Sequence, residues 1–159
     1  MGRAELSSRT CTIARAAALV GDEWTIMILR EMFLGNRRFD DFLRQTGMSS
    51  HLLSQRLKKL EAEGAISRTA YSQHPPRFEY RLTEMGRELW PLIICLKQWG
   101  DRWLSDGRPP VKLVHTSCGA VTKPIMTCSE CGEPIDARST TVRLSNAFTA
   151  ERKGAAKRD

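Results

Sequence analysis

With 159 residues, of which 41% are hydrophobic and 27% charged, the chain has the length and composition of one soluble, well-cored domain with a small appendage. No apolar run approaches the length of a membrane span, and residues 1–10 lack the apolar core of a signal peptide, so we expect a cytoplasmic protein. A net charge of +7 suits an anionic partner, with nucleic acid the first candidate, although many basic proteins bind no DNA.

The N-terminal third of the chain predicts a polar start followed by three helices. Residues 1–10 are polar and are expected to be flexible. The alanine-rich stretch 11–20 predicts a helix because alanine has the highest helix propensity. The next helix, residues 23–34, has a wide apolar face and is therefore expected to be buried. A third, short helix is predicted over 38–44, and a turn follows at 45–47.

Residues 49–63 predict an amphipathic helix. Leu53, Leu57 and Leu60 repeat at spacings of four and three, which places them on one core-facing stripe. The opposite face is polar and basic. A two-stranded β-hairpin is predicted over residues 65–82, around a connection that contains two prolines. The predicted fold class is therefore mainly α with a small β-hairpin.

This order of helix, turn, basic helix and hairpin is that of a winged helix-turn-helix. A helix of this size fits the major groove, and the hairpin can reach the neighbouring backbone or minor groove. A charge run alone would usually be a solvated face, but here the order, the leucine stripe and the basic face agree. We therefore predict binding to double-stranded DNA. The candidate DNA-binding residues are Arg44, Ser50, His51, Ser54, Gln55, Lys58, Lys59, Arg68, Gln73, His74 and Arg77.

The chemistry of these side chains divides them into two roles. Gln55 can pair bidentately with adenine. The other candidates for base edges are His51, Ser54 and Lys58. The candidates for phosphate contacts are Arg44, Arg56, Lys59, Arg68 and Arg77. Arg56 lies toward the flank of the helix, so a bridge to another part of the protein is the alternative for it.

A long helix is predicted from Thr83 to about Leu104, with Pro91 either kinking it or delaying its start by a turn. Its apolar residues follow the 3-4-3-4 spacing of a coiled-coil seam, at Leu89, Leu92, Leu96, Trp99 and Trp103. Such a stripe is usually intradomain core, but a helix of this length has little of its own domain left to cover it. We therefore predict a homodimer whose two recognition helices lie about one DNA turn apart on a palindromic site.

Several motifs in this region, in order, resemble the HxlR-type family of winged-helix transcription regulators. They are Val20-Gly21-Asp22-x-Trp24-Thr25, Arg38-Phe39-Asp40-Asp41-Phe42, Leu53-Ser54-Gln55-Arg56-Leu57-Lys58 and Pro75-Pro76-Arg77-x-Glu79-Tyr80-x-Leu82-Thr83. The resemblance covers roughly residues 11–104 and implies a homodimeric regulator with dimer contacts from the N-terminal and C-terminal helices. Thr12 and Glu23 depart from the family pattern, where proline and a basic residue are frequent. The sequence leaves open whether DNA binding represses transcription, as a repressor would, or activates it.

A second set of residues predicts a metal site near the C-terminus. The ligand pairs are His115-x-x-Cys118-Gly119 and Cys128-x-x-Cys131-Gly132, whose types and spacing match a structural Cys₃His zinc site. The glycine after each pair permits a tight turn. The alternative is a hairpin with reduced or disulfide-linked cysteines and no metal. The predicted organisation is a flexible N-terminus (1–10), the winged helix-turn-helix and dimerisation domain (11–107), a zinc-ribbon-like β-rich unit (108–146) and a disordered tail (147–159).

The two remaining cysteines receive different interpretations. Cys11 stands just before the first helix, whose N-terminus favours a reactive thiolate, and the resemblance implies a redox or electrophile sensor at this position. The alternative is a small buried residue in the dimer interface. Cys95 is expected to be packed among apolar neighbours. The four tryptophans are expected mostly in the core, although they could line an effector pocket near the dimer helices.

An enzyme is disfavoured because the sequence has no nucleotide-binding glycine loop and no nucleophile elbow. The predicted function is that of a dimeric DNA-binding regulator whose activity is controlled by a small molecule or an oxidant. One alternative is a thiol or metal sensor in which Cys11 or the C-terminal cluster controls DNA binding. Another is a protein-interaction module that recruits a partner through the C-terminal unit.

Overall fold

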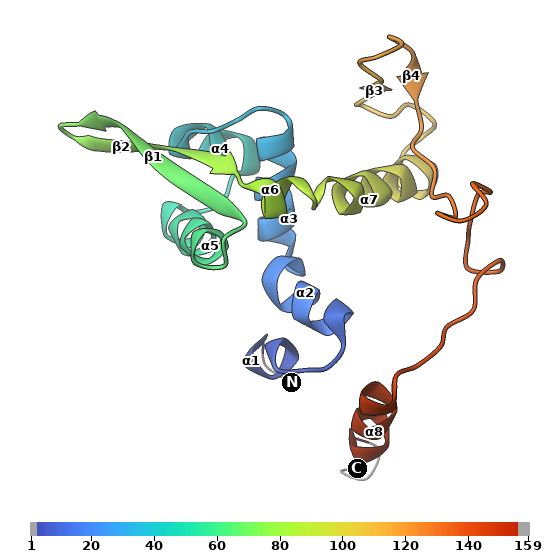
Figure 1. The fold of residues 1–159 in the computed structure, drawn as a ribbon. Helices are drawn as coiled ribbons and strands as arrows, with labels where there is room; N and C mark the ends of the chain where they lie inside the picture. Colours follow the sequence, from blue (N-terminus) through green and yellow to red (C-terminus); the bar gives the residue numbers. More distant parts are fainter. Residues whose placement is uncertain (1–2, 156–159) are drawn as a thin grey trace. The chain divides into compact units, whose positions relative to one another are not determined.

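A computed structural model describes residues 3–155 of the chain (Figure 1). Its helices are α1 (Arg3–Ser7), α2 (Thr12–Val20), α3 (Glu23–Phe33), α4 (Phe39–Thr46), α5 (Ser50–Ala62), α6 (Glu84–Arg87), α7 (Trp90–Trp103) and α8 (Asn146–Ala155). Its strands are β1 (Ile66–Gln73), β2 (Pro76–Leu82), β3 (Leu113–Val114) and β4 (Val121–Thr122). The chain divides into two compact units between Ile93 and Ile94, within α7. The mainly α fold with a hairpin wing is confirmed in the first unit.

Side-chain caps fix where three helices of the first unit begin. The Asp22 carboxylate accepts hydrogen bonds from the Thr25 backbone N–H at 3.1 Å and from its hydroxyl at 2.6 Å, at the start of α3. Ser49 Oγ accepts from the Leu52 N–H at 3.3 Å at the start of α5. Thr83 Oγ1 accepts from the Gly86 N–H at 3.2 Å at the start of α6. Each cap satisfies a backbone donor that has no partner within its helix.

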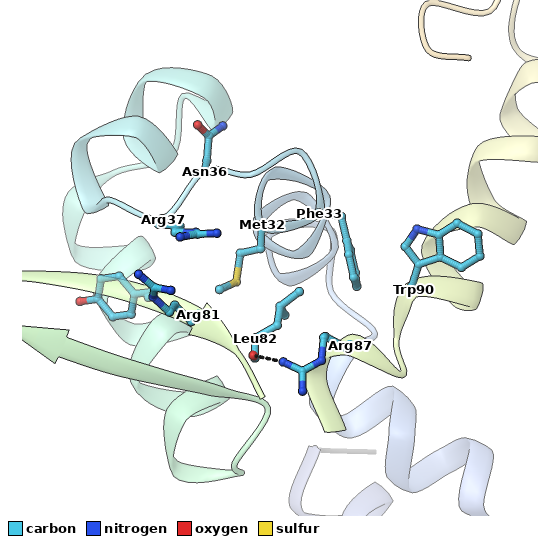
Figure 2. A pocket seen from close by; sticks show the side chains of 9 residues that line it. Met32, Phe33, Asn36, Arg37, Arg81, Leu82, Arg87 and Trp90 are labelled. Atoms are coloured by element: carbon cyan, nitrogen blue, oxygen red, sulfur yellow. Dashed lines mark hydrogen bonds between the residues drawn. The ribbon is translucent and has the colours of Figure 1, made fainter. Parts of the chain in front are cut away.

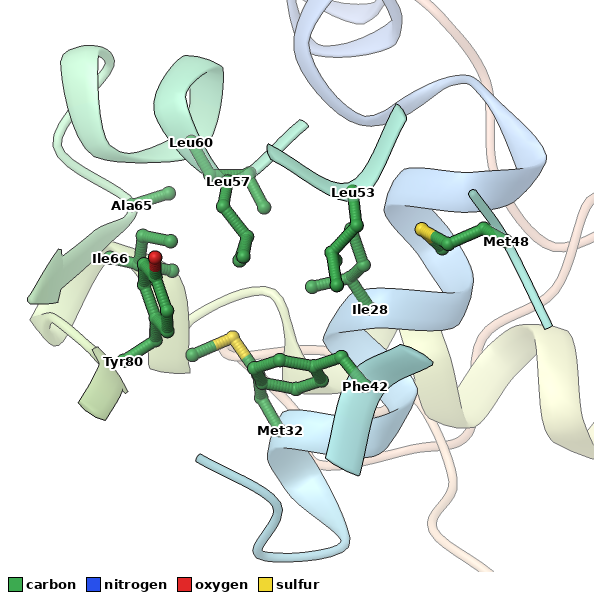
Figure 3. Close-up of a cluster of buried hydrophobic side chains, with 10 residues drawn as sticks. All are labelled: Ile28, Met32, Phe42, Met48, Leu53, Leu57, Leu60, Ala65, Ile66 and Tyr80. Atoms are coloured by element: carbon green, nitrogen blue, oxygen red, sulfur yellow. The ribbon is translucent and has the colours of Figure 1, made fainter. Parts of the chain in front are cut away.

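The core of the first unit lies between α3, α4, α5 and the base of the hairpin (Figure 3). The predicted leucine stripe of α5 is buried, and Leu53 is fully enclosed. Phe42 of α4 meets Tyr80 of β2 edge to face, with ring centroids 6.3 Å apart. Buried aliphatic side chains contribute about 1.5–3 kcal/mol each. The stripe therefore sets which face of α5 points outward.

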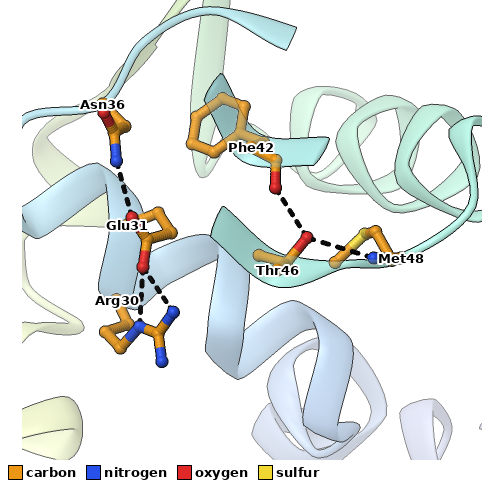
Figure 4. A network of polar contacts seen from close by, with 6 residues as sticks. All are labelled: Arg30, Glu31, Asn36, Phe42, Thr46 and Met48. Carbon is orange, nitrogen blue, oxygen red and sulfur yellow. Dashed lines mark hydrogen bonds and ion pairs between the residues drawn. The ribbon is translucent and has the colours of Figure 1, made fainter. Parts of the chain in front are cut away.

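The turn between α4 and α5 has the sharp geometry of a helix-turn-helix. Gly47 has a φ of 69°, a left-handed conformation that favours glycine, and its N–H donates to the Leu43 carbonyl at 2.9 Å. The Thr46 hydroxyl donates to the Phe42 carbonyl at 2.6 Å (Figure 4). These contacts end α4 and redirect the chain into α5.

The hairpin is antiparallel, with Ile66 opposite Leu82 at its base and Gln73 opposite Pro76 at its tip. A bulge lies between Ala70 and Ser72. The Tyr80 N–H donates to the Arg37 carbonyl at 2.8 Å, which fastens β2 to the loop between α3 and α4. The wing is therefore anchored at its base, while its tip projects from the core (Figure 1).

The long helix predicted from Thr83 is two helices, α6 and α7. Pro91 is the second residue of α7, where its missing N–H leaves no intrahelical bond unmade, so the predicted delay of the helix start is confirmed. Of the five residues predicted for the dimer seam, Leu89 packs with Val20, Leu29 and Ile93 in a second core cluster, as the intradomain alternative expects.

The chain ends differ from the sequence prediction. Helix α1 occupies part of the stretch 1–10 that was expected to be flexible. The prediction of a disordered tail over 147–159 is corrected for 147–155, which belong to α8; residues 156–159 lie outside the described part. The Ser145 hydroxyl caps α8 by accepting from the Phe148 N–H at 3.2 Å, and the segment is rich in good helix formers. Of the described residues, none forms a helix long and apolar enough to cross a membrane.

Candidate nucleic-acid interface

The outward face of α5 carries the predicted base-reading side chains. Ser50, His51, Gln55 and Lys58 are exposed, whereas Ser54 is half-buried at the border of the face. Gln55 Nε2 and His51 Nε2 lie 2.9 Å apart, one helical turn from each other. This bond holds the two side chains side by side, and both retain polar atoms that point away from the core.

Two basic residues on the flank of α5 bind the protein itself. The Arg56 Nε donates to Asp22 Oδ1 at 2.9 Å, which confirms the bridging alternative for this arginine. The Lys59 ammonium donates to the carbonyls of Ala18 and Leu19 at the C-terminal end of α2. Lys59, expected at phosphate, is therefore half-buried and fastens α5 to α2. The sequence periodicity could not show this because it does not reveal which flank meets α2.

The carboxylate at this junction is held in its charged form. Burial alone raises the pKa of Asp22, but hydrogen bonds from Thr25 and the Arg56 guanidinium outweigh it and leave the pKa below its ordinary value. The arrangement favours an ionised Asp22 that caps α3 and orients Arg56.

The tip of the wing exposes Gln73, His74 and Arg77, as predicted. The two other predicted phosphate ligands, Arg68 in β1 and Arg44 in α4, have acidic partners. Arg68 pairs with Glu61 at 3.0 Å and its guanidinium lies 4.8 Å from the Phe78 ring centroid. Arg44 pairs with Asp41 at 2.5 Å on an exposed surface. Exposed pairs of this kind contribute little to stability, so these arginines can exchange a carboxylate for a phosphate.

Sequence reasoning missed Arg38. Its guanidinium lies 4.7 Å from the centroid of the Tyr71 ring on the wing and reaches Glu79 Oε1 at 3.3 Å. Tyr71 stands at the bulge of β1, which could not be located from the sequence. Arg38 therefore connects the start of α4 to the wing through both charge and stacking.

Within the second unit, the seam predicted on α7 is largely exposed. Leu96 is 43%, Trp99 57% and Trp103 62% exposed, and Leu92, in the first unit, is 40% exposed. Cys95, expected to be packed, is exposed as well. The prediction for Cys95 was wrong because the apolar neighbours in its sequence do not cover it within a single chain. An uncovered apolar helix face of this kind is typical of an interaction surface.

Cys11 is the N-cap residue of α2 and is partly exposed. Its side chain makes no capping hydrogen bond. The thiol is therefore within reach of solvent at the start of a helix, as the sensor interpretation requires.

The C-terminal cluster forms two separate pairs. Cys118 Sγ lies 3.4 Å from His115 Nδ1, and the Gly119 N–H donates to the His115 carbonyl at 2.8 Å. In the second pair the Gly132 N–H donates to the Cys128 carbonyl at 2.9 Å. Within the described residues, no group of three or more His, Cys, Asp or Glu side chains gathers as a metal site. The zinc site and the ribbon remain predictions.

The second knuckle nevertheless has the electrostatics of a thiolate ligand. Backbone N–H groups of Cys131 and Glu130, together with the Cys131 side chain, lower the pKa of the Cys128 thiol. Donors that point at sulfur stabilise the thiolate that binds a metal. Gly119 and Gly132 both adopt the left-handed conformation, so the two turns have similar backbone shapes.

The fold, with an exposed polar helix after a sharp turn and a hairpin beside it, defines a winged helix-turn-helix protein of the transcription-factor class. Residues 19–108, more than half of the chain, match the family described as HxlR-like helix-turn-helix. The chain belongs to this family.

Relatives and solved structures agree with the assignment. An uncharacterized HTH-type transcriptional regulator of Mycobacterium tuberculosis is 45% identical over 141 residues, which cover 88% of this chain and 89% of the relative. The crystal structure of PA1607, a proposed transcription factor, superposes with a TM-score of 0.77 at 29% identity, covering 89% of this chain and 99% of that one. The oxidised redox regulator HypR is 34% identical, with a TM-score of 0.54 over 58% of this chain and 96% of its own.

Proposed function

We propose that this transcriptional regulator acts as a homodimer in the cytoplasm, binding a palindromic operator through α5 and the wing tip. The family and the relatives are transcriptional regulators, which are not enzymes. The observation that carries the proposal is the polar outer face of α5, held outward by its buried leucine stripe. Gln55 and Lys58 on that face reach base edges, while Arg77 at the wing tip meets phosphate.

The dimer part of the proposal is supported by the exposed seam of α7. Leu92, Leu96, Trp99 and Trp103 present apolar surface that a second copy of the same helix would cover. A two-fold axis would place two α5 helices on successive turns of the major groove and so requires a palindrome.

The decisive experiment is binding of the purified protein to its own upstream DNA in excess random competitor. We expect tight, competitor-resistant binding to one fragment, with footprints on two half-sites about one helical turn apart. Equal affinity for the upstream fragment and for random DNA would contradict a sequence-specific regulator.

A thiol-responsive mode is a second candidate, favoured by the accessible Cys11 and by the likeness to HypR, which is described as a redox regulator. In this mode a peroxide accepts two electrons and two protons from two Cys11 thiols, which form a disulfide between subunits. The operator titration is repeated after mild peroxide treatment with wild type, Cys11→Ser and, as the matched control, Cys95→Ser. A response to peroxide that survives in Cys11→Ser would exclude Cys11 as the switch.

We propose further that the C-terminal unit holds one structural zinc ion between its two knuckles. Support comes from the matching turns at Gly119 and Gly132 and from the N–H groups directed at the Cys128 thiol. A unit this short has little core, so a metal would supply much of its folding free energy. The test is elemental analysis of the full chain purified without chelator, with Cys128→Ser beside Cys95→Ser. About one zinc per chain, lost only in Cys128→Ser, is expected; metal-free wild type that takes up no added zinc would refute the site.

A further inference from the structure

A pocket of about 490 Å³ opens in the first unit, in the size range of small-ligand sites (Figure 2). It lies between the C-terminal end of α3 with the loop that follows, strand β2, and the segment from α6 into the start of α7. None of the residues discussed above as DNA-reading or zinc-binding lines it.

The polar lining of this pocket is cationic. It contains the guanidinium groups of Arg37, Arg81 and Arg87, and among the described residues that line it none is acidic. Arg87 Nη1 donates to the Leu82 carbonyl at 3.1 Å, which fixes its position and leaves its other N–H groups available. Arg81 Nη2 lies 3.3 Å from Glu79 Oε2, so part of its charge is offset.

Two carboxylates that are adjacent in sequence to lining residues, Glu79 and Glu31, already have partners. Glu79 also accepts from Arg38, at 3.3 Å. Glu31 is buried and accepts from Arg30 and, at 2.6 Å, from the Asn36 amide (Figure 4). Neither carboxylate is paired with Arg37 or Arg87, and the lining itself carries three arginines and no acidic side chain, which favours an anion.

Besides the three arginines, Asn36 and Tyr80, the other lining side chains are apolar. They are Met32 and Phe33 from α3, Leu82 from β2 and Trp90 from α7. In Figure 2, Phe33 and Trp90 lie on one side of Met32 and Leu82, and Arg37 and Arg81 on the other. Trp90 is 38% exposed although it is large and aromatic. A ligand with a flat apolar body would cover such surface.

We propose that this pocket binds a small organic anion, an aromatic carboxylate by class, as the effector of the regulator. The guanidinium groups match the bidentate geometry of a carboxylate, and the Phe33–Trp90 side accommodates the ring. Binding and regulation are separable here: only the regulatory part rests on the proposed DNA-binding function. The pocket is lined both by β2, which is a strand of the wing, and by Trp90 at the start of α7. A bound anion therefore contacts both elements. An effector changes DNA affinity when it binds two arrangements of these elements unequally.

The test is calorimetric titration of the full-length protein, without DNA, with 1-naphthoate and with the neutral 1-naphthalenemethanol. Wild type should bind the anion saturably and the alcohol at least about tenfold more weakly. The variant Arg37→Gln/Arg87→Gln should lose about tenfold or more in naphthoate affinity. The control Arg138→Gln/Arg143→Gln removes the same charge from exposed sites in the second unit and should bind as wild type does. Circular dichroism melting checks that each variant is folded.

A second measurement locates the ligand. Naphthoate should change tryptophan fluorescence in wild type, and Trp90→Phe should abolish most of that change while calorimetric binding persists. Three results each overturn the proposal: no saturable naphthoate binding, equal affinity for the alcohol, or undiminished affinity in the folded Arg37→Gln/Arg87→Gln variant. The operator titration is run separately with and without naphthoate. If naphthoate binds the pocket but the protein shows no preference for its operator, the proposed DNA-binding function is refuted and the proposed anion site is not.

Discussion

At the scale of single residues, the protein separates side chains that can read DNA from side chains that hold the reader in place. Along α5 the division is sharp: Gln55 and Lys58 face outward, while Arg56 and Lys59 are bonded to Asp22 and to carbonyls of α2. All four are polar and close in sequence; the sequence offered the bridging role for Arg56 as an alternative, but the positioning role of Lys59 is revealed only by the fold.

A pair of substitutions tests the outward-facing set. Gln55→Ala should relax sequence preference because the side chain facing a base edge is lost, at a cost of about 1–3 kcal/mol on operator DNA only. Arg77→Ala should weaken operator and random DNA alike and lower the salt dependence by about one phosphate contact. Fluorescence anisotropy titrations at several salt concentrations measure both. Equal losses on specific and random DNA for Gln55→Ala would show that this residue does not face the bases.

Asp22→Asn tests the positioning set. Asparagine can still cap α3, but the ion pair with Arg56 is lost, so we expect a decrease of about 2 kcal/mol in the free energy of unfolding near neutral pH. Urea denaturation measures this change.

The pH dependence has a defined sign. Because the pKa of folded Asp22 lies below its ordinary value of 3.8, its stabilisation is complete above that value and is lost as pH falls through the folded pKa. The difference in the free energy of unfolding between wild type and Asp22→Asn should therefore decrease in acid. If this difference in the free energy of unfolding stays constant from neutral to strongly acidic solution, the charge of Asp22 contributes nothing to stability.

At the scale of elements, the helices and the wing follow from local patterns, and their junctions do not. The leucine spacing, Gly47 and Pro91 each determine local structure within a few residues. The recognition helix, its turn and the delayed start of α7 were therefore predicted from the sequence. The bond from Lys59 to α2 joins segments 40 residues apart, and nothing in the local pattern encodes it. The candidate DNA-binding surface could thus be predicted from the sequence. The contact between Lys59 and α2, the Arg38–Tyr71 contact and the arginine-lined pocket could not.

The junction of α6 with the hairpin base is the tightest of these contacts. A Cβ on Gly86 would lie 2.0 Å from the Ala65 carbonyl oxygen, against backbone that cannot rotate away. We expect Gly86→Ala to lower the free energy of unfolding by about 2–3 kcal/mol by forcing α6 off the hairpin. The control is Gly100→Ala in α7, where a Cβ meets nothing within 4 Å. Similar urea midpoints for the two variants would show that the junction accommodates the added methyl group without a loss of stability.

At the scale of the whole molecule, the described residues leave apolar surface exposed along α7, which a second copy would cover in the proposed homodimer. Trp99→Asp should raise the dissociation constant of the proposed dimer about tenfold or more, because an aromatic side chain that the partner would bury is replaced by a charge. Sedimentation velocity over a range of protein concentrations measures it. Val142→Asp is the control, since Val142 is 83% exposed and lies off the predicted seam. A Trp99→Asp protein that dimerises as wild type does would place the interface elsewhere.

The anchoring of α5 also has a mechanical consequence. Helix α2 is a rod of nine residues, about 13 Å long, with Cys11 at one end and the carbonyls that hold Lys59 at the other. A short helix moves as a rigid body, so in the proposed thiol-responsive mode a tilt at the Cys11 end would reach α5 through the Lys59 ammonium and through the packing of Leu19 against the core. Substituting Lys59 with methionine would then remove the ammonium contact and weaken this proposed coupling between Cys11 and α5.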